Sequence, residues 1–153
     1  MYRMFIIAAV FLVGCASAPD GAMNYDQVEI PEPTDKESVF VFYRLYTPPL
    51  AYEMRVSVDG KQVASLPNNS FSYVKLAPGK FELKTSWTAW AMMPSKKQEL
   101  EIQPNQKLFL QLNSSVWTPT GIELGYGKSH SQQESEATAK LKECCKYIEQ
   151  APL

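Results

Sequence analysis

Histidine is almost absent, since the chain of 153 residues contains only one, His130. A single histidine cannot form a multi-histidine metal site, and no Cys-x-x-Cys pair replaces it. No serine lies in a Gly-x-Ser-x-Gly nucleophile motif. Basic clusters are also lacking, because 15 basic residues stand against 16 acidic ones and the longest basic run is Lys96-Lys97. We therefore expect no enzymatic activity, metal, cofactor or nucleic-acid partner, and we interpret His130 as a surface residue near a helix start.

Cysteine is scarce as well, with Cys144 and Cys145 adjacent and Cys15 far from both. This spacing defines neither a disulfide framework nor a metal site. On a helix, two adjacent side chains point about 100° apart, so a bond between them would strain the backbone. We expect one of this pair to be packed and the other to be free. A redox or intermolecular-disulfide role in an oxidising compartment is the alternative.

Long apolar runs are missing too. The run at Phe5–Val13 has nine residues, whereas a membrane-spanning helix needs about 20. Residues 1–14 therefore predict a signal peptide. The motif Leu12-Val13-Gly14-Cys15 resembles the lipobox of bacterial lipoproteins, which implies that Cys15 is acylated and becomes the first residue of the mature chain. Ala16 after the cysteine implies the outer membrane, and we expect the domain to face the periplasm. The alternative is an ordinary cleaved signal with an incidental cysteine.

The segment after Cys15 is polar and rich in proline. Ala16–Lys36 contains Pro19, Pro31 and Pro33 and no periodic apolar pattern. We therefore predict that residues 15–36 comprise the acylated cysteine and a flexible tether, which would hold the domain away from the membrane.

Residues 37–128 show short β-type runs separated by turn residues. Val39–Tyr43 is apolar on both faces, which is typical of a central strand. Met54–Val58 alternates apolar and polar residues, and Asp59-Gly60 then predicts a tight hairpin. We expect a single antiparallel β-sandwich of about seven or eight strands, Ig-like or prealbumin-like. Its further strands are predicted at 62–66, 71–76, 81–87, 98–103, 108–112 and, less regularly, 116–126.

Residues 129–153 predict one amphipathic α-helix packed on the β domain. Ser131 and Glu134 have the spacing of a capping box. An apolar stripe follows, and the helix is expected to end near Glu149. The stripe consists of Ala137, Leu141, Cys144 and Ile148.

Three stretches carry a resemblance to a known family: Tyr43-Arg44, Val56–Leu66 with its Val-Asp-Gly-Lys hairpin, and Leu76–Leu83 with its Leu-x-Pro-Gly turn. They resemble bacterial lipoproteins of domain-of-unknown-function family 2846 and are similar to PEGA-type surface modules. The resemblance covers Ser38 to about Asn113 and implies a small lipid-anchored β-sandwich, with no known active site to transfer.

One connection between predicted strands is unusually apolar. Ser86–Pro94 includes Trp87, Trp90, Met92 and Met93. Such side chains dominate binding hot spots, so these four form a candidate patch for a protein partner. The alternative is that Trp87 and Met92 extend the flanking strands into the core.

An anchor and a compact domain without a catalytic motif predict a non-enzymatic envelope module. We expect it to attach to the membrane through Cys15 and to bind or support another envelope component, most simply a protein. The alternatives are an accessory subunit of an envelope-spanning secretion or assembly machine, similar in layout to the small sandwich lipoprotein of type VI secretion, and a small carrier of apolar ligands.

Overall fold

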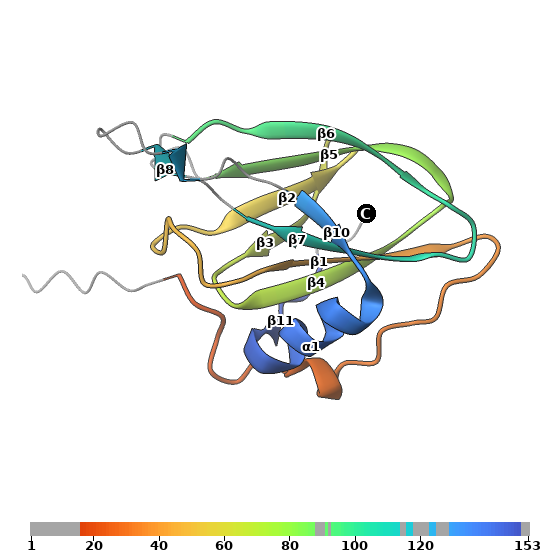
Figure 1. The fold of residues 1–153 in the computed structure, drawn as a ribbon, viewed down its shortest axis with the longest axis horizontal. Helices are drawn as coiled ribbons and strands as arrows, with labels where there is room; N and C mark the ends of the chain where they lie inside the picture. Colours follow the sequence, from red (N-terminus) through yellow and green to blue (C-terminus); the bar gives the residue numbers. More distant parts are fainter. Residues whose placement is uncertain are drawn as a thin grey trace, which may run out of the picture.

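The computed structural model describes residues 16–87, 91, 93–113, 116–117, 123–124 and 129–150. Within these ranges the protein is mostly β, with two larger sheets, a two-stranded sheet and one α-helix (Figure 1). The all-β expectation is confirmed at this level. The helices are η1 (Tyr25–Gln27, 3-10) and α1 (Glu134–Cys144). The strands are β1 (Ser38–Arg44), β2 (Met54–Val58), β3 (Lys61–Leu66), β4 (Ser70–Leu76), β5 (Gly79–Trp87), β6 (Lys96–Ile102), β7 (Lys107–Leu112), β8 (Val116–Trp117), β9 (Glu123–Leu124), β10 (Ser129–Gln132) and β11 (Lys146–Tyr147).

The larger sheets have the strand orders β10-β7-β1-β4-β11 and β3-β2-β5-β6, and β8 pairs with β9. Antiparallel pairing throughout was expected, and this is wrong for two pairs. Strand β1 runs parallel to β7, with Val41 opposite Phe109, and β11 runs parallel to β4. The physical reason is that these partners are distant in sequence, so no tight hairpin forces them to be antiparallel.

The predicted central strand is confirmed in β1, where all seven residues are buried. Phe40 and Phe42 join an apolar cluster between the two larger sheets. The alternate residues Val39, Val41 and Tyr43 belong to a second cluster on the outer face of the five-stranded sheet. Because successive side chains of a strand point to opposite faces, β1 supplies both cores.

The second core is closed by α1, which lies against the five-stranded sheet (Figure 1). Ala137 and Leu141 of the predicted stripe are buried there, while Cys144 is half-buried. Tyr25 of η1 joins the same cluster through the ring of Phe71, with the two centroids 5.4 Å apart.

The hairpin turn between β2 and β3 is confirmed. Asp59 and Gly60 have φ values of 47° and 81°, which are the left-handed conformations that a type I′ turn requires. The carboxylate of Asp59 accepts a hydrogen bond of 2.8 Å from the backbone N–H of Glu82, which fixes the turn against β5.

Two predictions about the helix boundaries are wrong. Ser131 is an extended residue of β10, paired with Leu110, and Gln133 is the N-cap without a side-chain hydrogen bond, so the expected capping box is not formed. At the other end, α1 stops at Cys144 and not near Glu149. The chain is extended from Cys145 onward because Lys146 and Tyr147 pair with β4.

The flexible tether expected at residues 16–36 also requires correction, because this segment lies along the domain. The backbone N–H of Tyr147 donates to the carbonyl of Met23 at 2.8 Å, and Lys142 forms an ion pair of 2.9 Å with Asp26. Asn105 N–H donates to the carbonyl of Thr34 at 3.1 Å. The physical reason is that backbone hydrogen bonds, which no apolar pattern reports, attach the segment to the folded strands. The proposed signal peptide, residues 1–14, lies outside the described residues.

Candidate functional site at the Ala16 end of the domain

Ala16, the residue after the predicted lipidation site, is fixed to the domain. Its N–H donates to the carbonyl of Leu50 at 2.9 Å, and its carbonyl accepts from the backbone N–H of Asn68 at 2.8 Å. The fully buried side-chain amide of Asn68 donates to the carbonyls of Ala16 and Leu50 at 3.1 and 2.9 Å. Cys15 itself lies outside the described residues, so its acylation stays a prediction.

The connection between β1 and β2 is organised by Arg44, which is fully buried. Its guanidinium donates hydrogen bonds of 2.7 to 3.1 Å to four carbonyl oxygens. Three of them belong to this connection and one to the end of β3; they are the carbonyls of Thr47, Pro49, Tyr52 and Leu66. The cation of Arg44 therefore joins the β1–β2 connection to the end of β3.

The electrostatics of Arg44 are those of a buried cation without a carboxylate in direct contact among the described residues. Burial lowers its pKa to about 10, and the nearby charge of Glu53 opposes that shift. The guanidinium still carries its charge at neutral pH. Its Nε has no hydrogen-bond partner in the described part of the chain. Sequence reasoning missed this role, because an arginine at the end of an apolar strand normally predicts an exposed side chain.

The apolar patch predicted from the sequence is described only in part. Trp87 ends β5 and is half-buried against the inter-sheet cluster, with its ring under the Arg44 guanidinium at 4.9 Å from the centroid. Met93 is half-buried, and Trp90 and Met92 lie outside the described residues. The binding role of these four residues stays a prediction, but the structure gives Trp87 a packing role as well.

The two adjacent cysteines form a disulfide, contrary to the expectation of one packed and one free thiol. The helical spacing assumed for them does not apply, because α1 ends at Cys144 and Cys145 is extended, with φ −115° and ψ 136°. Cys145 is buried, and its Sγ lies 4.0 Å from the backbone oxygen of Arg44. The disulfide therefore lies beneath the strand that carries the buried cation.

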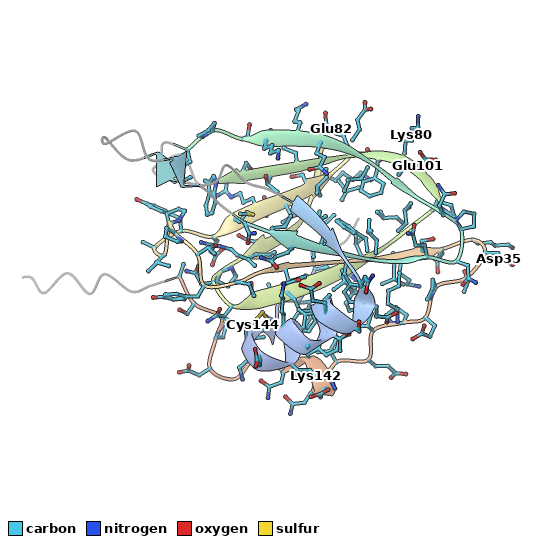
Figure 2. The ribbon with its side chains drawn as sticks, viewed as in Figure 1. Asp35, Lys80, Glu82, Glu101, Lys142 and Cys144 are labelled. Carbon is cyan, nitrogen blue, oxygen red and sulfur yellow. A yellow bond between two sulfur atoms is a disulfide. The ribbon has the colours of Figure 1, made fainter. Side chains whose placement is uncertain are left out.

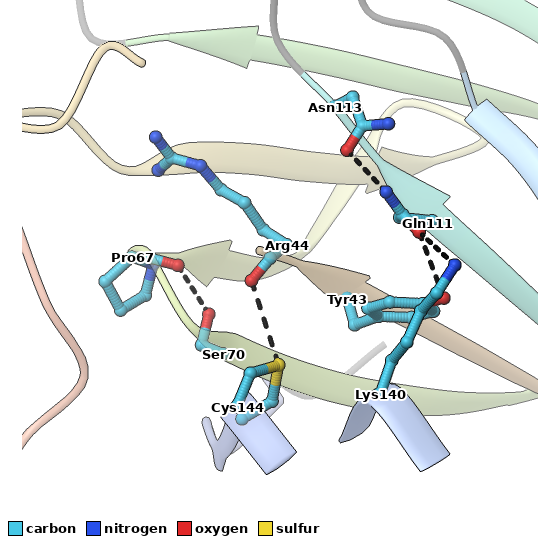
Figure 3. The surroundings of a disulfide bond; sticks show 9 residues. Tyr43, Arg44, Pro67, Ser70, Gln111, Asn113, Lys140 and Cys144 are labelled. Atoms are coloured by element: carbon cyan, nitrogen blue, oxygen red, sulfur yellow. Dashed lines mark hydrogen bonds between the residues drawn. A yellow bond between two sulfur atoms is a disulfide. The ribbon is translucent and has the colours of Figure 1, made fainter. Parts of the chain in front are cut away.

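A polar cluster lies under α1 (Figure 3). The side-chain oxygen of Gln111 accepts hydrogen bonds from the Tyr43 hydroxyl at 3.4 Å and from Lys140 Nζ at 3.3 Å. Lys140 also forms an ion pair of 2.9 Å with Glu136. Burial, with a smaller contribution from the charge of Glu136, raises the pKa of Tyr43 to about 12, so this phenol stays neutral and is unsuited to act as a base. The cluster holds α1 on the sheet.

Two hollows bear on the alternative of an apolar-ligand carrier. One has a volume of about 10 Å³, which is the space of one water molecule, and is lined by apolar and polar residues together, namely Met54, Leu83, Leu112, Thr85, Lys96, Gln98 and Asn113. The other, about 170 Å³, is open and lined mostly by charged residues, namely Asp59, Lys80, Glu82 and Glu99 together with Phe81. Neither has the enclosed apolar lining that a carrier requires.

Among the described residues, no group of three or more His, Cys, Asp or Glu side chains gathers in a way that could hold a metal. His130 lies in β10 opposite Gln111, and its side chain is outside the description. No helix in the described part is long and apolar enough to cross a membrane. No protein-family model matches the chain, and the search of curated proteins finds no match.

Proposed function

We propose that this protein is a lipid-anchored, non-enzymatic module of the bacterial envelope that binds or supports another envelope protein. Cys15 carries the acyl groups, and the domain faces the periplasm from the outer membrane. The domain is a β-sandwich of the kind that the resemblance to family 2846 and PEGA modules implies. The central observation is that Ala16, directly after Leu12-Val13-Gly14-Cys15, is hydrogen bonded to the folded domain.

The placement of Ala16 supports anchoring because hydrogen bonds attach the residue that follows the acylated cysteine to the folded domain. Two backbone hydrogen bonds and the buried amide of Asn68 hold Ala16. Consecutive Cα atoms are about 3.8 Å apart, so an acyl group on Cys15 lies next to the fold. Several acyl chains on one cysteine make attachment durable, whereas one chain binds only marginally.

The anchor is tested by comparing Cys15→Ala with the unaltered chain in intact cells. We expect the unaltered chain to fractionate with the outer membrane and to show the mass of an acylated chain beginning at Cys15. Cys15→Ala should lose that mass and become soluble in the periplasm. Cys144→Ser is the matched control, since it removes a cysteine of the folded domain, which pairs with Cys145, and should leave membrane attachment unchanged. An unaltered chain without acyl mass would overturn the proposal.

The binding role needs a separate measurement. Crosslinking in intact cells should recover the same envelope protein with the unaltered chain in repeated captures, and much less of it with the soluble Cys15→Ala variant. Full complementation of a deletion by the soluble variant would show that placement at the membrane is not part of the function. Circular dichroism of that variant establishes that the domain is still folded.

A further inference from the structure

The disulfide between Cys144 and Cys145 joins two neighbouring residues, so it closes a minimal loop. A cross-link stabilises a fold mainly by restricting the unfolded chain, and it does so least when the loop is short. This bond therefore adds little to the stability of the whole domain. Its effect is local, because it links the last residue of α1 to the extended residue that follows. Figure 2 shows Cys144 at this end of the helix.

The bond determines where α1 ends. Adjacent side chains of a helix point about 100° apart, so the two sulfur atoms meet only when one residue leaves the helix. Cys145 does so, with φ −115° and ψ 136°. In the sequence, however, the apolar stripe of the helix continues to Ile148. Once the bond is open, Cys145 can join the helix, and the helix then competes with β11 for the residues that follow.

Strand β11 is attached to β4 by few hydrogen bonds. The backbone N–H of Lys146 donates to the carbonyl of Asn69 at 3.0 Å, and that of Ile148 donates to the carbonyl of Phe71 at 2.9 Å. The strand has only two residues, both half-buried, and lies at the end of its sheet. Such a strand opens at a lower free energy than a central one. A change of the backbone at Cys145 therefore alters β11 first.

The residues on either side of the bond also hold part of the N-terminal segment. Before the bond, Lys142 forms an ion pair of 2.9 Å with Asp26. After it, the backbone N–H of Tyr147 donates to the carbonyl of Met23 at 2.8 Å. None of residues 16–37 is fully buried, so the attachment of this segment depends on a small number of such contacts.

We propose that the Cys144–Cys145 pair is a redox-active disulfide that controls this attachment. In the disulfide form, β11 and residues 23–26 are held on the sheet. In the dithiol form, α1 continues past Cys144, and residues 23–26 lose their contacts with residues 142–147. The inference rests on the proposed envelope location for its oxidising compartment, but it does not depend on the acylation of Cys15.

The reaction is thiol–disulfide exchange with the dithiol of an envelope oxidoreductase. A thiolate of that dithiol attacks Sγ of Cys144, the more accessible residue of the pair, since Cys145 is buried. The S–S bond breaks, and the Cys145 sulfur leaves with the electron pair and takes up a proton beside the carbonyl of Arg44, 4.0 Å away. The second thiol of the partner then displaces Cys144. Two electrons and two protons pass to the cysteine pair, and the partner becomes a disulfide.

The test compares the purified full chain before and after reduction with dithiothreitol under native conditions. Amide hydrogen exchange is followed by mass spectrometry in two peptides, one with residues 23–28 and one with residues 145–148, and thiol alkylation shows whether the pair is reduced. We expect exchange to rise at least about tenfold in both peptides on reduction. The backbone N–H of Asp59, which donates to the carbonyl of Glu82 at 2.9 Å in the other large sheet, should keep its rate.

Cys144→Ser is the matched control variant, because it has no disulfide to reduce. Its two peptides should exchange at the rate of the reduced chain, with or without dithiothreitol. Three results would overturn the inference: a disulfide that dithiothreitol does not open under native conditions, a reduced chain whose peptides exchange as in the disulfide form, or an equal rise at Asp59. A chain without acyl mass would overturn the proposed anchor and leave this comparison unchanged.

Discussion

The guanidinium of Arg44 lies over the ring of Trp87, with 4.9 Å between its carbon and the ring centroid. This contact joins the last residue of β1 in one sheet to the last residue of β5 in the other. A cation over an indole ring contributes more when both groups are removed from water, as Arg44 is. The same guanidinium binds four carbonyl oxygens, so the pair fixes both the sheet ends and the connection that contacts Ala16.

Arg44→Ala is expected to lower the free energy of unfolding by about 3 kcal/mol or more, because it leaves buried carbonyl groups without donors. Arg44→Lys should cost less, about 1–2 kcal/mol, since an ammonium keeps the charge but cannot reproduce the planar fork. Arg55→Ala is the control, as Arg55 is exposed on β2, and should change stability by less than about 0.5 kcal/mol. Urea unfolding measures all three. Equal losses for Arg44→Ala and Arg55→Ala would contradict the structural role.

The raised pKa of Tyr43 predicts a loss of stability at high pH. Its pKa is about 12 in the folded protein against 10.0 for an ordinary tyrosine, so the unfolded chain loses this proton first. The contribution of Tyr43 to the free energy of unfolding is therefore complete below pH 10. It falls as the pH rises toward 12, by about 1 kcal/mol for each pH unit. The pKa of Arg44 is lowered to about 10, so its contribution to the free energy of unfolding rises with pH over the same range.

Tyr43→Phe isolates the tyrosine contribution from that of arginine. The difference in unfolding free energy between the unaltered chain and Tyr43→Phe should decrease by about 1 kcal/mol between pH 10 and pH 11. Tyr46→Phe provides the control for the removal of a hydroxyl group, because Tyr46 is exposed. A Tyr43→Phe difference that stays constant with pH would show that the phenol titrates normally.

Substitution by serine should lower the stability of the domain by different amounts at the two cysteines of the disulfide. Both substitutions break the bond, but the loop that it closes is minimal, so little chain entropy is lost with it. Cys145 is buried in the cluster under β1, while Cys144 is half-buried. Cys145→Ser places a hydroxyl in that cluster and should cost about 1–3 kcal/mol, with less than about 1 kcal/mol for Cys144→Ser. Thermal unfolding of both variants, monitored by circular dichroism, makes the comparison; equal losses would contradict it.

The strands could be predicted from the sequence because their signals are local. Alternation marks Met54–Val58, the run of apolar residues marks β1, and Asp59-Gly60 marks the turn. The parallel pairing of β1 with β7 could not be predicted in this way, since it depends on how the chain passes between the sheets. The end of α1 was misplaced for a related reason. The residues after Cys144 continue a helical pattern, but pairing with β4 outweighs that preference.

The site depended on contacts that leave no pattern in the sequence. Arg44 binds backbone carbonyl groups, which every residue has, so the side chains of its partners do not reveal these contacts in the sequence. Ala16 is likewise held through its backbone. Only Asn68, buried in a turn, could have suggested a structural amide, and asparagine is so common in turns that the signal is weak. The lipobox resemblance rests on the sequence alone, because Cys15 lies outside the described residues.

The attachment of the N-terminal segment predicts that Asn68 controls its mobility. Asn68→Ala removes the two amide hydrogen bonds to the carbonyls of Ala16 and Leu50, which are buried or partly buried, and should cost about 1–3 kcal/mol. Because the released backbone can reach water, amide hydrogen exchange should rise at Ala16 and at nearby residues such as Ser17, before it rises in β1. Ser65→Ala is the control, since it removes an exposed hydrogen bond of 2.6 Å to Glu53 and leaves Ala16 untouched. Amide hydrogen exchange is measured by mass spectrometry on both variants. If protection at Ala16 is the same in both, Asn68 does not hold the segment. The fixed distance between anchor and domain must then arise from other contacts.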